Sequence, residues 1–320
     1  MDGSREDDDL RRRIADQFSG RGERAGVWRT FGLFLETDAF LNLGHSPRVV
    51  PHVVGDPQAR LARVVGERLV AALGDGADAP ETAGVEAAGA ETADVEAAGS
   101  RVLDVGCGRG GPAVEFASSC GFDVTGVDLV PHNVAAARAT AREADVEPSA
   151  RPSFLVGDAT RLPVRTGAVD GATAVDALVY VPERERVFAE LGRVVAAGGA
   201  VVLTDLVRAP DLSPADRRAV ERFAAAWDMP LAGTTAGYRA GLADAGFDRV
   251  RVVDLSRHSV GRFRRWTTAY GLLSRTPAGW LLDRWLEGRD VDAAAVREQV
   301  RRAHAALPHL RHVLVVAQRH

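Results

Sequence analysis

The 320-residue sequence predicts an α/β fold: one doubly wound sheet of seven strands, mostly parallel with the last strand antiparallel, together with N-terminal helices and a helical cap. From residue 101 onward, short Val- and Leu-rich runs alternate with helical periodicity, which is typical of right-handed βαβ units with both sheet faces covered. The closing apolar run, HVLVVAQR at 312–319, follows a long helical block. This order predicts an antiparallel pair at one sheet edge with the cap inserted before its last strand.

The expected elements follow the chain in order. Amphipathic periodicity predicts helices at 8–20, 26–41 and 57–73. Strands are expected near 101–105, 122–127, 152–156, 169–175 and 199–205, and helices near 111–120, 131–144 and 183–195. Beyond them we expect helices at 212–228 and 235–245, a strand at 247–255, a helical block over 258–306 and the closing strand at 312–319.

Four parts are expected in the chain: an N-terminal helical segment at 1–76, a low-complexity acidic linker at 77–100, a ligand-binding core at 101–206, and a cap with the closing strands at 207–320. Within the linker, ETAGVEAAGA at 81–90 recurs as ETADVEAAGS at 91–100. So little apolar bulk predicts a mobile linker, with a frayed surface helix as the alternative.

Composition excludes several classes of function. All 40 basic residues are Arg, so Schiff-base lysine chemistry is excluded, and the net charge of −4 indicates no nucleic-acid partner, although local patches are compatible with it. The two cysteines have neither a disulfide framework nor zinc-site spacing. The charged N-terminus and the lack of an apolar run of about 20 residues predict a soluble cytoplasmic protein with no membrane span. The sequence indicates no oligomeric state.

The stretch RVLDVGCGRGG at 101–111 places glycines where a strand ends and a helix begins. Glycines there permit a tight turn and a close approach of the backbone to a ligand, but Gly106, Gly108 and Gly111 also satisfy the G-x-G-x-x-G of a dinucleotide site. Asp128, at the end of the second strand, suits the ribose of a dinucleotide and equally the ribose of another nucleoside ligand. The loop and Asp128 therefore do not distinguish between these two kinds of ligand.

Two further carboxylates favour one of them. Asp104, two residues before Gly106, would repel a pyrophosphate but suits a ligand with a cationic group. Asp158, in FLVGDATRLP at the end of the third strand, can meet the amino group of an adenine. Three carboxylates at three consecutive strand ends outline a nucleoside with a zwitterionic tail, the shape of S-adenosylmethionine.

The successive motifs VLDVGCGRGG, VTGVDL, FLVGDATRLP and VDGATAVDALVYVPERERVFAELGRVVAAGGAVVLTDL resemble those of class I S-adenosylmethionine-dependent methyltransferases. More narrowly, they resemble the small-molecule group that includes tocopherol, sterol and antibiotic-tailoring methyltransferases. The similarity covers about 101–206, with weaker likeness in LNLGHS and GYRAGLADAGFDRVRVVDLS. The resemblance implies a Rossmann-like sheet and methyl transfer to O, N or C of a small, lipophilic or aromatic substrate.

The resemblance also implies how the cofactor is bound. Gly106, Cys107 and Gly108 would line its methionine part, and Asp104 would help to hold that loop. Asp128 would take the ribose hydroxyls. The remaining expected cofactor-binding residues are Leu129, which would flank the adenine, Asp158 and Ala159 at its edge, Asp176, which would face both cofactor and substrate, and Asn133, which stands where the group often has Gln.

The catalytic base is the open question. Members of this group often carry a His pair before the Pro-acid dipeptide, whereas this chain has ALVYVPE, with Val179 and Tyr180 in those places. Tyr180, His45 and His258 are the candidate catalytic residues, although a phenol with a pKa near ~10 is a poor base and Tyr180 can equally be a packing residue. Methyl transfer can also proceed through alignment alone, without a base.

The segment RFRRWTTAYGLLSRTPAGWLLDRWLEG at 262–288 is unusually aromatic for this chain. Its large side chains predict either a cap over a bulky substrate or an ordinary helix-to-helix core; they are Trp266, Tyr270, Trp280, Leu281 and Trp285. Its Arg262, Arg264 and Arg265 could meet an acidic substrate, but we favour a solvated helix face.

Two rival functions remain. A nicotinamide-dependent oxidoreductase would use the same sheet class, but Asp104 and the Gly-Asp-Ala motif at 157–159 argue against it. A non-catalytic module that binds S-adenosylmethionine without turnover is suggested by the missing His pair.

Overall fold

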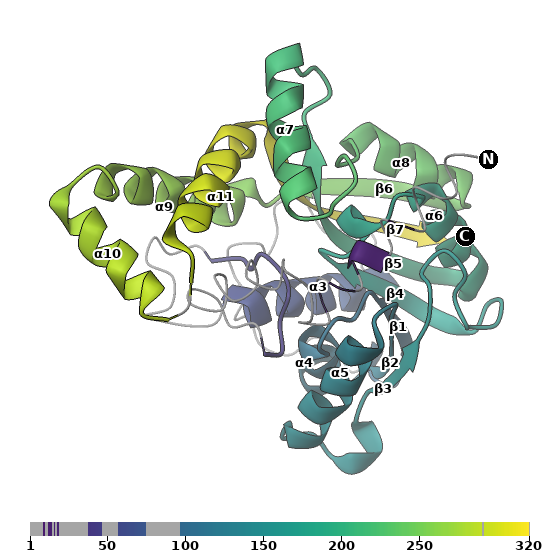
Figure 1. Ribbon diagram of the computed structural model, residues 1–320. Coiled ribbons are helices and arrows are strands. Elements are labelled where there is room, and N and C mark those ends of the chain that lie inside the picture. The colour runs from purple at the N-terminus through teal and green to yellow at the C-terminus, as the bar shows by residue number, and fades with distance from the viewer. Residues whose placement is uncertain are drawn as a thin grey trace.

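The computed structural model describes residues 9, 12–14, 16, 18, 38–46, 57–74, 97–289 and 291–319. Its seven strands form one sheet in the order β3-β2-β1-β4-β5-β7-β6 (Figure 1). All pairs are parallel except those of β7, which is antiparallel to both neighbours. The strands are β1 (Arg101–Val105), β2 (Asp123–Asp128), β3 (Ser153–Val156), β4 (Val169–Val175), β5 (Val195–Arg208), β6 (Phe247–Asp254) and β7 (Leu310–Arg319). The predicted fold class is confirmed.

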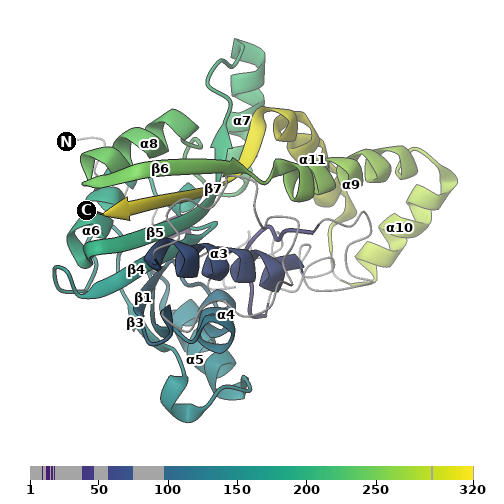
Figure 2. The same ribbon diagram turned by 180° about the vertical axis from the view of Figure 1, so that it is seen from behind.

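Helices cover both faces of this sheet. Figure 2 shows α3 lying along one face, where α4 and α5 also pack, and α6 and α8 pack on the other. Because both faces are buried, alternate residues of β5 enter different cores: Val202 packs with α3, whereas Leu203 packs with α6. These helices are α3 (Pro57–Leu73), α4 (Gly111–Cys120), α5 (Pro131–Glu143), α6 (Arg184–Val194) and α8 (Thr235–Asp244).

A helical cap stands beyond the carboxyl ends of the strands. The predicted block over 258–306 resolves into α9 (Val260–Leu273), α10 (Pro277–Glu287) and α11 (Ala293–Ala306), and α7 (Pro214–Ala226) packs against α11. Since α9, α10 and α11 all lie between β6 and β7 in sequence, the cap is inserted before the last strand, as the sequence predicts. Within the described residues no helix combines the length and apolar character needed to cross a membrane.

The element bounds differ from expectation mainly at β5, which begins directly after α6 and not near 199. Gly198, with φ +80°, and Gly199, whose added Cβ would lie 2.4 Å from the Asp170 carbonyl, conceal the start of the strand in the sequence. The predicted helix at 26–41 lies outside the described residues except for 38–41, which are not helical. The duplicated segment at 81–100 also lies outside them, except for 97–100. The division into four parts stays a prediction.

Candidate functional site

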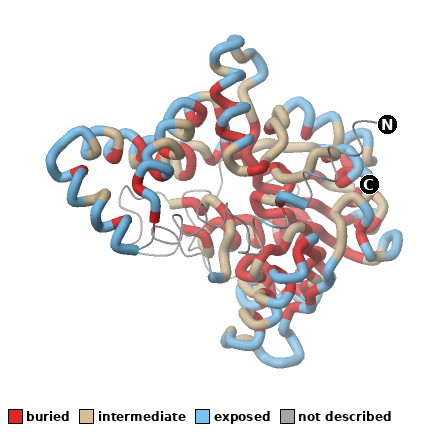
Figure 3. Tube along the Cα trace, in the orientation of Figure 1, coloured by how far each residue is buried: buried red, intermediate tan, exposed pale blue. Residues whose placement is uncertain are grey.

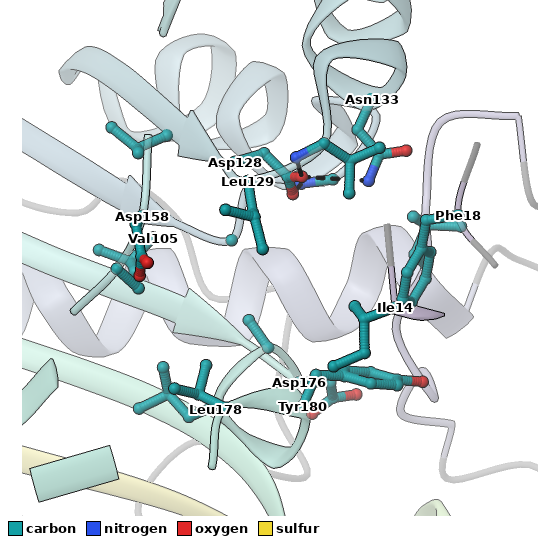
Figure 4. Close-up of a pocket in the computed structure, with 18 of the residues that line it drawn as sticks. Ile14, Phe18, Val105, Asp128, Leu129, Asn133, Asp158, Asp176, Leu178 and Tyr180 are labelled. Atoms are coloured by element: carbon teal, nitrogen blue, oxygen red, sulfur yellow. Dashed lines mark hydrogen bonds between the residues drawn. The ribbon is translucent and has the colours of Figure 1, made fainter. Parts of the chain in front are cut away.

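A pocket opens at the carboxyl ends of β1, β2 and β4, where the strand order reverses on either side of β1. Such a reversal is where open α/β sheets bind ligands. Figure 4 shows its side chains converging from the ends of β1, β2, β3 and β4 and from the N-terminal segment. The expected residues that line it are Gly106, Gly108, Asp128, Leu129, Asn133, Asp158, Ala159, Asp176 and Tyr180.

The glycine loop after β1 turns tightly against its neighbours. Gly106 has a φ of +70°, and a Cβ there would lie 2.5 Å from the Cβ of Ala177. The Gly106 and Cys107 amides both donate to the Val127 carbonyl oxygen, at 2.7 and 3.1 Å. The turn thus presents a bare backbone surface to the pocket while directing these two donors into the protein.

The rest of the loop directs its donors inward as well. The Gly108 amide donates to Asp128 Oδ2 at 2.9 Å, and the Gly110 amide donates to the Cys107 carbonyl oxygen. At the start of α4, the Gly111 amide donates to the carbonyl oxygen of Ala39 at 3.0 Å. A phosphate site requires N–H groups that point at the ligand. These five amides are already bonded to protein acceptors, which disfavours a pyrophosphate and with it the nicotinamide alternative.

Asp128 is the polar centre of the pocket wall. Besides the Gly108 amide, its carboxylate accepts from the Val130 amide at 2.9 Å and from Asn133 Nδ2 at 3.2 Å, both at Oδ1. Burial raises the pKa of this carboxyl, and the three donors act in the opposite direction. Oδ1 accepts two of these bonds, whereas Oδ2 accepts only one and keeps a lone pair, so a ligand hydroxyl can still donate to the carboxylate at this strand end.

Asp104 and Cys107, both expected to bind the cofactor, are not among the residues that line the pocket. Asp104 is buried beside its β4 neighbour Thr173, whose hydroxyl donates to Asp104 Oδ1 at 2.9 Å. Its Oδ2 has no hydrogen-bond partner among the described residues. The Cys107 side chain is buried against Gly126 and Phe154, and burial raises the pKa of its thiol well above the ordinary value, so it is not a nucleophile.

Replacing Asp104 by Asn is expected to stabilise the ligand-free protein at pH 8 by about 1 to 2 kcal/mol. Burial raises the pKa of Asp104 from 3.8 to about 7, so its contribution to stability is full below the unfolded value and is lost as the pH rises through about 7. Urea unfolding at pH 5 and pH 8 measures this, with the exposed Asp145→Asn as control. An equal effect of the substitution at both pH values would contradict the assignment.

The far end of the pocket is formed by the segments after β2 and β3. Leu129 is 38% exposed and lies on the pocket wall, which leaves its side chain free to contact a flat ring. Asp158 Oδ1 accepts from both the amide and the hydroxyl of Thr160, each at 2.8 Å. Asp158 therefore stabilises a turn through its side chain, and this turn holds Asp158 and Ala159 at the pocket.

Asp176, just past β4, joins four separate parts of the chain. It has a left-handed backbone, with φ 54°. Its Oδ2 accepts from the Leu43 amide at 2.8 Å, and its Oδ1 accepts from the Thr204 hydroxyl at 2.9 Å and from His312 Nε2 at 2.8 Å. The facing His312 and these donors lower the pKa of Asp176 despite its burial, so the carboxylate is ionised at neutral pH and is a weak proton acceptor.

His312 on β7 was not foreseen from the sequence, and both of its ring nitrogens have hydrogen-bond partners. The Ser259 hydroxyl donates to the Leu255 carbonyl oxygen at 2.9 Å, so its oxygen accepts from His312 Nδ1, also at 2.9 Å. His312 Nε2 faces the ionised Asp176, so the imidazole joins Asp176 to Ser259. Ser259 is fully buried, so this Asp-His-Ser series holds the fold together and does not form a hydrolytic triad.

Tyr180 lies at the pocket beneath residues of the N-terminal segment. Its ring packs edge-to-face with Phe18 at a centroid distance of 5.1 Å, and Ile14 lies beside both (Figure 4). Burial first, and then the carboxylates of Asp176, Asp205 and Asp228, raise the pKa of Tyr180 well above its ordinary value. A phenol that stays protonated can donate a hydrogen bond but cannot act as a base at neutral pH.

The other two candidate catalytic residues meet outside this pocket. The rings of His45 and His258 lie edge-to-face with centroids 5.3 Å apart, and the Ser46 amide donates to the His258 carbonyl oxygen. His45 is fully buried and His258 is half-buried, and neither lines the pocket. Their catalytic roles stay predictions.

The arginine cluster of the cap divides into two environments. Arg264 and Arg265 are exposed, as expected for a solvated helix face. The expectation is wrong for Arg262, which is 5% exposed and donates to the Leu43 carbonyl oxygen at 3.0 Å. Burial and the charge of Arg265 lower the pKa of Arg262 to about 10. Arg262 thus connects α9 to the same segment that Asp176 holds through the Leu43 amide.

Residues 103–203, which span β1 to β5, match the protein family described as the methyltransferase domain. These residues form a class I methyltransferase domain. The domain carries the glycine loop, Asp128, Asp158 and Asp176, and the match confirms the family predicted from the motifs.

The methyltransferase domain is also what this chain shares with curated relatives. The (+)-O-methylkolavelool synthase of Herpetosiphon aurantiacus is 32% identical over 152 residues, 48% of this chain and 52% of the relative. The 27-O-demethylrifamycin SV methyltransferase of Amycolatopsis mediterranei is 31% identical over 157 residues, 48% of this chain and 56% of the relative. The chain thus spans about half the length of these relatives.

Solved structures extend the similarity of fold beyond the methyltransferase domain. The geranyl diphosphate C-methyltransferase of Streptomyces coelicolor has a TM-score of 0.62 at 18% identity and covers 97% of this chain and 98% of its own. The cyclase SpnF has a TM-score of 0.59 at 21% identity, covering 86% of each chain. At these identities the likeness shows the fold alone.

Proposed function

We propose that this protein transfers the methyl group of S-adenosylmethionine to an oxygen, nitrogen or carbon atom of a small, lipophilic or aromatic metabolite. One observation carries the proposal: the glycine loop directs its amides into the protein, while carboxylates stand at and behind the same strand ends. That surface suits a ligand with a ribose diol and a cationic tail better than one with phosphates. The family of the domain agrees with this choice.

The residues present fit this cofactor. Asp128 would take the ribose hydroxyls, and Asp158 and Ala159 would meet the adenine edge. Gly106 and Gly108 would lie against the methionine part. Asp104 lies behind them, and its buried Oδ2 has no donor among the described residues. Burial raises the pKa of this carboxyl, and a ligand cation nearby would favour its ionised form. Leu129, Asn133 and Asp176 are further proposed contacts that line the pocket.

When bound, S-adenosylmethionine supplies an activated methyl group, so the protein has mainly to align the accepting atom and exclude water. The pocket provides the exclusion through Ile14, Phe18 and Leu41, apolar residues of the N-terminal segment that lie over its polar wall. Asp176 is a weak proton acceptor, and Tyr180 stays protonated and can only donate a hydrogen bond. Alignment is therefore proposed as the main source of rate.

Two of the relatives carry O-methylation in their names, which makes hydroxyl-bearing terpenoids and polyketides the first substrates to test. We expect titration calorimetry to detect S-adenosylmethionine and S-adenosylhomocysteine but not NADH. S-adenosylhomocysteine should then accumulate when the protein is incubated with such hydroxyl compounds. Binding of NADH in place of S-adenosylmethionine would contradict the proposal.

A second candidate function is a module that binds the cofactor without methyl transfer. The missing His pair favours it. Cofactor binding without release of S-adenosylhomocysteine across hydroxyl, amine and isoprenoid substrates would select this candidate over methyl transfer.

A further inference from the structure

The hairpin formed by α9 and α10 carries an unusual share of the exposed apolar surface. Eight large apolar side chains are exposed in the described part of the chain, and five of them lie between 272 and 285. The five side chains, with their exposed fractions, are Leu272 at 63%, Leu273 at 41%, Trp280 at 61%, Leu281 at 62% and Trp285 at 41%. We call these five the hairpin patch.

Neither sequence-based alternative accounts for the hairpin patch. Trp266 and Tyr270 do form a helix-to-helix core, with centroids 5.5 Å apart and Leu286 packed beside them. Trp280, Leu281 and Trp285 lie on the other side of α10 and take no part in that core. Figures 1 and 3 show α10 at an extremity of the molecule, exposed to solvent and far from the pocket end of β1. These side chains therefore cover neither a core nor the pocket.

The hairpin is positively charged in a negatively charged protein. Residues 260–289 contain six arginines and two acidic residues, a formal charge of +4, whereas the whole chain has −4. Two of the guanidinium groups lie over the indoles of the patch: Arg284 is 5.3 Å from the Trp280 ring centroid, and Arg289 is 3.9 Å from that of Trp285. Indole rings and cations thus share one outer surface.

We propose that the α9–α10 hairpin docks on the surface of an anionic lipid bilayer, with the hairpin patch in the interfacial layer and the arginines at the headgroups. Tryptophan favours that boundary, and interfacial helices combine an exposed apolar face with basic residues. A second copy of this chain is the weaker candidate, because a symmetric contact would bring two hairpins of charge +4 together. The proposal is independent of the methyl transfer proposed above.

Flotation of the full chain with phospholipid vesicles tests the docking. We expect the protein to float with vesicles of phosphatidylcholine and phosphatidylglycerol, and much less with phosphatidylcholine alone or at high salt. Replacing Trp280, Leu281 and Trp285 together by Ser should lower the apparent partition coefficient at least about tenfold. The double variant Arg284→Glu/Arg289→Glu, which leaves the apolar residues in place, should also lower it on anionic vesicles.

The matched control replaces exposed apolar residues elsewhere: Leu155→Ser/Val156→Ser on β3, where the wild-type side chains are 40% and 51% exposed, should float like the wild type. Thermal unfolding confirms that each variant is folded. The proposal is overturned if the wild type does not float with anionic vesicles, or if the triple Ser variant floats equally well. A wild-type dimer that the triple variant converts to a monomer, with no flotation of either, would assign the patch to a second copy.

Discussion

Asp128→Asn is expected to weaken the binding of S-adenosylmethionine about ten- to a hundredfold, because a charge-assisted hydrogen bond from a ribose hydroxyl is worth roughly 1.5–3 kcal/mol. The carboxylate also accepts from Gly108, Val130 and Asn133, which lie on both sides of it. An amide group has a single oxygen, so one of these donors would face an NH₂ group. The variant thus loses both the ligand contact and part of the loop's support. Titration calorimetry measures the affinity.

Asp123→Asn is the control for this experiment. Asp123 is the same residue type on the same strand, at its exposed first position and away from the pocket. Its affinity should equal that of the wild type, while thermal unfolding shows that both variants are folded. An Asp128→Asn protein that binds the cofactor normally would refute the ribose assignment.

The second large effect is expected on stability. His312→Ala should destabilise the protein by about 3 to 5 kcal/mol near neutral pH, because it removes the side chain that pairs with the buried Asp176 carboxylate. Urea unfolding measures the difference, with the exposed His132→Ala as control. If His312→Ala lowers the free energy of unfolding by less than about 0.5 kcal/mol, the effect is no larger than that of an ordinary surface substitution. The pairing of Asp176 with His312 would then not stabilise the fold.

The pH dependence of this pair has a definite sign. Because the pKa of Asp176 is lowered, its stabilising contribution is full above the unfolded value of 3.8 and is lost as the pH falls through the folded value. The difference between wild type and His312→Ala should therefore narrow below about pH 4. If the two residues act together, the double variant Asp176→Asn/His312→Ala should lose less than the sum of the single variants.

The sheet was predictable because its signals are local. Apolar runs, glycine turns and helical periodicity occur within single segments, and right-handed crossovers then restrict the strand order. The pairing of Asp176 with His312 spans 136 residues and leaves no local signal except a histidine in an apolar strand. The burial of Arg262 likewise depends on Leu43, 219 residues earlier in the chain.

The site was predictable in part, as the fold was. Carboxylates at strand ends were found because the carboxyl ends of parallel strands meet at one edge, which places Asp128, Asp158 and Asp176 at one pocket. The inward direction of the loop amides was not predicted, because it depends on the carbonyl oxygens of Val127 and Ala39, which the glycine pattern does not reveal. Ile14 and Phe18 were also missed as pocket residues, since helical periodicity does not tell which surface a helix covers.

The position of β7 has a consequence for biosynthesis. It is made after every other strand, yet it occupies an interior place, pairing with β5 on one side and β6 on the other. Until the ribosome has added residues 310–319, β5 has a free edge and β6 has no partner strand in the sheet, and such unpaired edges invite self-association of nascent chains. A stop codon just before Leu310 should therefore yield insoluble protein, even though every pocket residue has already been translated.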